Sequence, residues 1–146
     1  MAKPWMRVDT VDFSKPLHSW NTPEKWDSVF TAYVFAHPMR SGVSELRYGF
    51  PDSNLDARTI KELISISEWL YSEWRQGKRC LSRCQAGLNR SSLVTALVLM
   101  RDGYSAEDAI SLIREKRHGA LFNQNFVDWL RTDPLSKKLE ESILKV

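Results

Sequence analysis

Residues 79–100, RCLSRCQAGLNRSSLVTALVLM, pass from a short strand-like segment through a polar turn into a long apolar run. RCLSRC (79–84) predicts a strand with Cys80 and Leu81 on opposite faces. SSLVTALVLMRDG (91–103) predicts a helix that ends at Gly103, because glycine is favoured just past a helix end. This helix is apolar nearly all round, and such helices are buried. We therefore expect it at the centre of the domain.

The rest of the chain alternates between strand and helix patterns. We expect strands at 28–36, 46–50 and 79–84, and helices from about 56 to 77, 91 to 103, 105 to 117, 123 to 131 and 134 to 146. Residues 1–25 are expected to form a short strand and loops. Alternating strands and helices predict an α/β fold with a small, mostly parallel central sheet of about four to five strands, flanked by helices. Residues 1–146 are expected to form a single domain.

Composition and charge narrow the class of protein. The chain has 146 residues, 42% of them hydrophobic and 27% charged, which is typical of a soluble globular domain. A net charge of +3 suits anionic substrates but falls short of the basic stripe of a dedicated nucleic-acid binder. The longest apolar run, residues 93–100, is too short to span a bilayer, and no signal peptide is expected. We therefore expect a cytoplasmic protein with no membrane partner.

The two cysteines are not expected to form a disulfide with each other. Cys80 and Cys84 are four residues apart, so on one strand their Cα atoms would be roughly 13 Å apart. A disulfide requires less than about 7 Å. Two reduced thiols are typical of a cytoplasmic protein, and we interpret Cys80 as a small buried hydrophobic residue.

The turn before the central helix has the chemistry of an oxyanion site. The first N–H groups of a helix have no internal partners and carry partial positive charge. Gly87 allows a sharp turn around an anion, and Arg90 adds a bidentate donor suited to phosphate. The residues expected to bind phosphate are Gln85, Ala86, Gly87, Leu88, Asn89 and Arg90.

The same field favours the thiolate form of Cys84, which would then be a nucleophile facing the bound phosphorus atom. Ser91 or Ser92, in the first turn of the helix, could donate a hydrogen bond to the sulfur when it must leave again. The departing oxygen also needs a proton. PDSNLD (51–56) follows a strand at the sheet edge where ligand sites gather. We select Asp52 as the general acid, with Asp56 as the alternative.

These residues resemble a known family. Cys84, Arg90 and Ser91 match the signature of the cysteine-dependent protein tyrosine phosphatases, and CQAGLNRSS is similar to the dual-specificity branch. The resemblance covers roughly residues 26 to 131. FPDS (50–53) resembles the general-acid loop of that family. NQNF (123–126) resembles the segment that packs behind the phosphate loop, so we interpret Asn123 as structural support.

The resemblance implies a phosphatase with a phosphocysteine intermediate and with no metal or cofactor. Cys84 would attack the phosphoryl group, Asp52 would protonate the leaving oxygen and then activate water, and Ser91 would ease thiolate departure. The implied substrate is a phosphorylated protein or peptide, carrying phosphotyrosine and also phosphoserine or phosphothreonine. One residue departs from the family pattern: Arg83 stands where the family has His. Its side chain should point away from Cys84.

Three other functions remain open. GLNRS resembles the G-x-N-R of RNA-acting relatives, so an RNA 5′-triphosphatase is an alternative. A phosphoinositide phosphatase is another, although QAGLN has no Lys to neutralise further phosphates. A non-catalytic phosphate-binding module is the third, and Arg83 is its only support.

Overall fold

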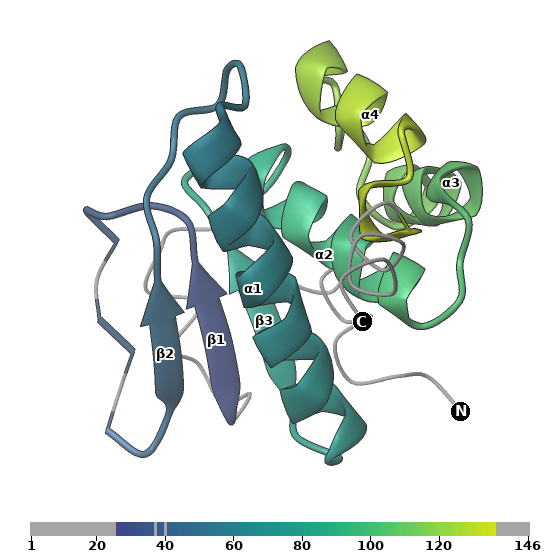
Figure 1. The fold of residues 1–146 in the computed structure, drawn as a ribbon. Coiled ribbons are helices and arrows are strands. Elements are labelled where there is room, and N and C mark those ends of the chain that lie inside the picture. The colour runs from purple at the N-terminus through teal and green to yellow at the C-terminus, as the bar shows by residue number, and fades with distance from the viewer. Residues whose placement is uncertain (1–25, 37, 40, 137–146) are drawn as a thin grey trace, which may run out of the picture.

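The computed structural model describes residues 26–36, 38–39 and 41–136. Its elements are β1 (Ser28–Thr31), β2 (Ser44–Arg47), α1 (Ala57–Arg75), β3 (Cys80–Arg83), α2 (Arg90–Arg101), α3 (Ala106–Lys116) and α4 (Gln124–Arg131). Figure 1 shows α1 beside the sheet, α2 next to it, and α3 and α4 farther out. The α/β class is therefore confirmed.

The three strands form a parallel sheet in the order β2-β1-β3. Thr31, at the end of β1, pairs with Arg47 of β2 and with Arg83 of β3. The carboxyl ends of all three strands therefore meet at one edge. Open α/β sheets place their ligand sites at this edge.

Helix α2 is the central helix that its sequence predicts. It contacts β3, α1, α3 and α4, and residues 91–99 are all buried. Its apolar side chains join the main hydrophobic core with Phe30, Leu63 and Phe126. A helix buried on every side fixes the position of its own N-terminus, and that N-terminus follows the loop that the sequence predicts to bind phosphate.

Strand alternation divides β3 between two faces of the sheet. Cys80 packs in the main core, and the Ser82 hydroxyl donates to the Ser91 carbonyl on α2. Leu81 instead joins a second, smaller cluster with Trp26 and Val29. Arg83 has the same parity as Leu81, so it lies on the face away from α2.

Two predictions about the sheet need correction. The described residues contain three strands rather than four or five, and the expected strand within residues 1–25 lies outside them. Strand β1 ends at Thr31 and not at residue 36, because residues 33–36 form a turn closed by the Ala36 N–H and the Tyr33 carbonyl, 3.1 Å apart. Their aromatic and β-branched composition resembles that of a strand.

The remaining boundaries shift by a few residues. Strand β2 covers residues 44–47 rather than 46–50. The expected last helix begins at Pro134, and its residues 137–146 lie outside the described part. Within the described ranges, no helix is both long and apolar enough to cross a membrane.

Candidate active site

The sulfur of Cys84 lies at the base of the loop that joins β3 to α2. The Gly87 N–H donates to it at 3.2 Å, and the Ser91 hydroxyl oxygen is 3.3 Å away. The Cys84 residue is only 2% exposed. A sulfur in this position has two hydrogen-bonding groups beside it, one from the loop and one from the first turn of α2.

The loop backbone follows the path that the sequence predicts. Gly87 has a φ of 69°, in the left-handed region that glycine adopts without strain. Gln85 and Ala86 are exposed at the tip of the loop, whereas Asn89 is buried. Behind the loop, the Leu121 N–H donates to the Leu88 carbonyl at 2.8 Å. This backbone contact therefore holds the loop from behind.

Arg90 begins α2 and reaches back across the site. Its Nη1 donates to the Phe50 carbonyl at 3.2 Å, and its guanidinium lies 5.9 Å from the centre of the Tyr33 ring. These contacts fix the plane of the guanidinium beside the loop, where a bidentate phosphate contact would need it.

Asp52 is bound by two amide side chains. Asn89 Nδ2 donates to one carboxylate oxygen at 2.9 Å, and Asn123 Nδ2 donates to the other at 2.7 Å. The Asn123 N–H in turn donates to Asn89 Oδ1 at 2.9 Å. The structure thus brings Asp52 to the loop that is predicted to bind phosphate. The alternative acid, Asp56, is instead the N-cap of α1 and accepts from the Thr59 N–H at 2.7 Å.

Sequence reasoning missed two residues of this constellation. Asn123 was expected to support the fold, yet its side chain contacts Asp52 directly while also capping α4. Tyr33 was assigned to a strand and instead faces Arg90. The Asn immediately before a helical pattern was a signal for a cap, but no local pattern reveals which side chain lies across from it.

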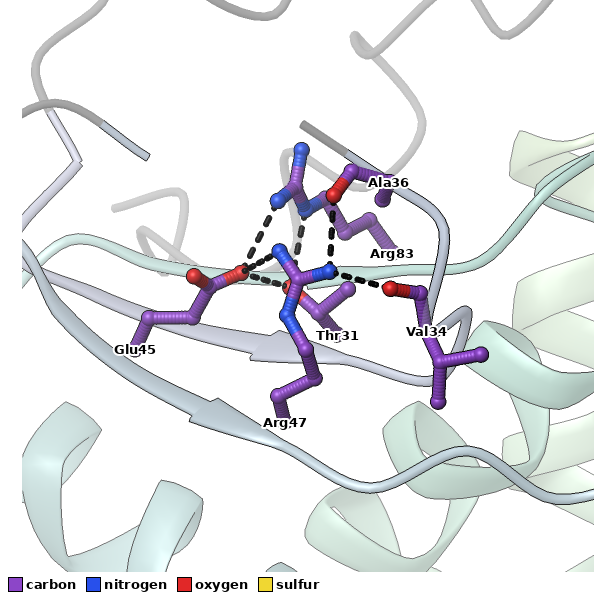
Figure 2. A network of polar contacts seen from close by, with 6 residues as sticks. All are labelled: Thr31, Val34, Ala36, Glu45, Arg47 and Arg83. Carbon is purple, nitrogen blue, oxygen red and sulfur yellow. Dashed lines mark hydrogen bonds and ion pairs between the residues drawn. The ribbon is translucent and has the colours of Figure 1, made fainter. Parts of the chain in front are cut away.

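Arg83, itself buried, takes part in a partly buried network on the far face of the sheet (Figure 2). Its Nε donates to Thr31 Oγ1 at 2.8 Å, and its Nη2 pairs with Glu45 at 2.8 Å. The Thr31 hydroxyl also donates to Glu45, and Arg47 pairs with the same carboxylate at 3.1 Å. We call Thr31, Glu45, Arg47 and Arg83 the arginine network. As predicted, the Arg83 side chain points away from Cys84.

The arginine network lowers the pKa of the carboxylate that it contains, that of Glu45. Burial raises the pKa of Glu45, but hydrogen bonds from Thr31 and Arg83, together with the charges of Arg83 and Arg47, outweigh burial and lower it. Burial lowers the pKa of Arg83, and its ion pair with Glu45 opposes that shift. Glu45 is therefore held in its charged form.

Comparison with known proteins identifies the family. Residues 30–133 match the family model described as dual specificity phosphatase, catalytic domain. The chain belongs to the dual-specificity phosphatase family. This confirms the resemblance carried by CQAGLNRSS, and the matched residues include both Asp52 and Asn123.

Individual relatives agree with this assignment. The chain is 30% identical over 83 residues to human protein tyrosine phosphatase type IVA 3, an alignment that covers 56% of this chain and 47% of the human protein. It is 52% identical over 48 residues to protein tyrosine phosphatase PRL-1 of Leishmania major, covering 32% and 27% of the two chains. The chain thus spans about half the length, or less, of these two relatives.

The fold is shared with solved members of the family. The crystal structure of human DUSP28 superposes with a TM-score of 0.69, covering 93% of this chain and 92% of that one, at 21% identity. At that identity, the superposition shows that the two proteins share a fold, but it does not show that they share a substrate.

Proposed function

We propose that this chain is a phosphatase that hydrolyses phosphate monoesters of phosphorylated proteins through a phosphocysteine intermediate. One observation carries the proposal: the Cys84 sulfur accepts the Gly87 N–H in the loop that leads into α2, and Asp52 is hydrogen-bonded to Asn89 of the same loop. Phosphotyrosine is the main substrate class, with phosphoserine and phosphothreonine also accepted.

In the first step, the Cys84 thiolate attacks phosphorus and a sulfur–phosphorus bond forms. The phosphorus–oxygen ester bond breaks, and the leaving oxygen takes the proton of Asp52. Arg90 and the N–H groups of residues 85–90 hold the other three phosphoryl oxygens, whose charge is stabilised in the transition state. The product alcohol or phenol then leaves.

In the second step, Asp52 acts as the base and takes a proton from water, whose oxygen attacks phosphorus. The sulfur–phosphorus bond breaks and its electron pair returns to Cys84. The Ser91 hydroxyl, 3.3 Å from the sulfur, stabilises the returning thiolate. Inorganic phosphate is released.

Asn89 and Asn123 act as positioning residues for Asp52. With an amide donor on each oxygen, the carboxylate is held as an acceptor. A protonated Asp52 must release one of these donors to turn its proton toward the leaving group. The two amides therefore hold the Asp52 carboxyl group near the loop.

An RNA 5′-triphosphatase is not favoured. In this structure both ends of the Asn89 side-chain amide are engaged, by Asp52 and by the Asn123 N–H. The Asn in GLNRS, which carries the resemblance to RNA-acting relatives, is therefore explained by its contacts with Asp52 and Asn123, without RNA. We place the protein in the cytoplasm, which the two free cysteines support.

The test is a comparison of turnover on a phosphotyrosine peptide, the matching phosphoserine peptide, triphosphorylated RNA and inositol phosphates. We expect hydrolysis of the phosphotyrosine peptide to be the fastest. Preference for RNA or inositol phosphates would refute the proposed substrate class. Phosphate binding without turnover of any substrate would instead indicate a non-catalytic binding module.

A further inference from the structure

Large hydrophobic side chains that remain exposed are few among the described residues, and two of them are adjacent. Phe35 is 80% exposed and Val34 is 52% exposed, and the third, Phe122, lies next to the Asp52 contact Asn123. Phe35 and Val34 belong to the turn of residues 33–36 that follows β1. We call this turn the aromatic lip. Exposed apolar side chains on a fixed turn are typical of a binding surface.

The aromatic lip is fixed by the arginine network. Arg47 Nη1 donates to the Val34 carbonyl at 2.9 Å and to the Ala36 carbonyl at 2.7 Å, as Figure 2 shows. Arg47 is in turn paired with Glu45, the partner of Arg83. The backbone of the lip is therefore held by a partly buried charge network, even though Phe35 is exposed.

The aromatic lip also packs on the segment that leads to Asp52. A Cβ added at Gly49 would lie 2.3 Å from Val34 Cγ1, so only glycine leaves room for the Val34 side chain there. The turn is thus pressed against the backbone three residues before the proposed acid.

A chain of ring contacts joins the aromatic lip to the phosphate loop. The Arg90 guanidinium lies 5.9 Å from the Tyr33 ring, and the Tyr33 ring lies 5.8 Å from the Phe35 ring in an edge-on arrangement. Two contacts of under 6 Å each therefore connect Arg90, which is proposed to bind the phosphate, to the exposed ring of Phe35. The Phe35 ring is therefore within reach of a polypeptide whose phosphate binds at Arg90.

We propose that Phe35, with Val34, binds an apolar side chain of the substrate polypeptide within about three residues of the phosphotyrosine, since an extended chain advances about 3.3 Å per residue. The proposal rests on the proposed phosphatase function and names its substrate more closely. Two neighbouring side chains on one turn offer an area that a single apolar side chain covers. This favours a peptide over a bilayer as the occupant.

The experiment uses two sets of phosphotyrosine peptides, in which Leu or Ala occupies each position within three residues of the phosphotyrosine. For the wild type, we expect one Leu position to lower KM by about 10-fold relative to Ala, which is about 1.4 kcal/mol. Phe35→Ser should remove that difference and leave kcat unchanged. The exposed phenylalanine away from the lip provides the control, and Phe122→Ser should keep the Leu preference.

A small aryl phosphate separates this proposal from the proposed function. Phe35→Ser should hydrolyse p-nitrophenyl phosphate as fast as wild type, because that substrate does not reach the lip. If wild type hydrolyses it but shows no Leu preference, or if Phe35→Ser keeps the preference, the lip proposal is wrong and the phosphatase function stands. If wild type hydrolyses neither substrate, the proposed function fails.

Direct binding tests the aromatic lip without turnover. Cys84→Ser, which keeps the phosphate loop, should bind the preferred Leu peptide about 10-fold more tightly than its Ala counterpart, and adding Phe35→Ser should abolish that difference. Gly49→Ala, which displaces the Val34 side chain, should reduce the difference in affinity between the Leu and Ala peptides. Loss of binding to phosphatidylcholine vesicles on Phe35→Ser, with peptide binding unchanged, would identify the lip as a membrane contact and overturn the proposal.

Discussion

Cys80 and Cys84 lie four residues apart, one at the start of β3 and the other directly after its end, and are equally buried, at 1% and 2% exposure. Their surroundings differ in kind. The Cys80 sulfur lies 3.6 Å from the Lys78 carbonyl in an apolar core, whereas the Cys84 sulfur receives the Gly87 N–H beside the Ser91 hydroxyl. Both remain free thiols, as their spacing predicts. Burial alone therefore does not determine what a cysteine does.

The two sulfurs differ in the sign of the charge that surrounds them. Burial, with the charges of Glu73 and Asp27, raises the pKa of Cys80 to about 12. At the carboxyl end of the strand, Cys84 meets the N-terminal end of α2, where partial positive charge accumulates. The parallel sheet brings that end of each strand to one edge, so Cys84 is the cysteine that we propose for chemistry, whereas Cys80 packs in the core.

The largest expected effect comes from replacing each of the two cysteines with serine in a separate variant. Cys84→Ser should lower kcat on p-nitrophenyl phosphate by about 1000-fold or more, because the nucleophile is lost. Cys80→Ser is the matched control and should leave kcat within about 2-fold in a steady-state assay. Comparable losses in both variants would contradict the assignment of chemistry to one end of the strand.

A second matched pair consists of the two aspartates near the same edge. Asp52→Asn should slow substrates with poor leaving groups by about 100-fold, because general acid catalysis is removed. Asp56→Asn should be nearly neutral, since Asn caps a helix as well as Asp. The measurement is kcat across a series of aryl phosphates. An equal loss for every leaving group in Asp52→Asn would argue against its role as the acid.

A smaller effect is expected from the hydroxyl beside the sulfur. Ser91→Ala should lower kcat by about 10-fold through slower breakdown of the phosphocysteine, since one hydrogen bond to a charged group is lost. Rapid mixing should then show a burst of phenol release. Ser92→Ala removes an equally buried hydroxyl from the same turn and should show no burst. A burst in both variants, or in neither, would rule out this role for Ser91.

The smallest effect concerns stability at the other cysteine. Because the pKa of Cys80 is raised from 9.0 to about 12, the folded state favours the protonated thiol. Its contribution is fully present below about pH 9 and is lost as pH rises toward about 12. Cys80→Ala should cost about 1 kcal/mol of unfolding free energy at about pH 8, and less at about pH 10. Urea unfolding at both values measures the difference, and a pH-independent difference would contradict the shift.

The sequence alone predicted the parts that depend on local pattern. The positive φ of Gly87, the burial of α2 and the side of the sheet that Arg83 occupies all follow from spacing and residue type. It did not predict the partners. Glu45 meets Arg83, and Asn123 meets Asp52, only because the parallel register and the path of the chain after α3 bring distant segments together.

The predicted end of β1 is wrong for a similar reason. Residues 33–36 have the composition of a strand, yet Arg47 holds two of their carbonyls and they form a turn. That turn carries both Tyr33 and Phe35, so the error in secondary structure also concealed the aromatic lip.

The central claim is that Cys84, and not Cys80, becomes phosphorylated during turnover. Acid quenching of Ser91→Ala during hydrolysis of p-nitrophenyl phosphate, followed by peptide mass spectrometry, tests it directly. The result we predict is one phosphoryl group on the peptide segment that begins at Cys84, absent from Cys84→Ser and retained in Cys80→Ser. A phosphoryl group that persists in Cys84→Ser, or that is missing while phenol is released in a burst, would contradict the account.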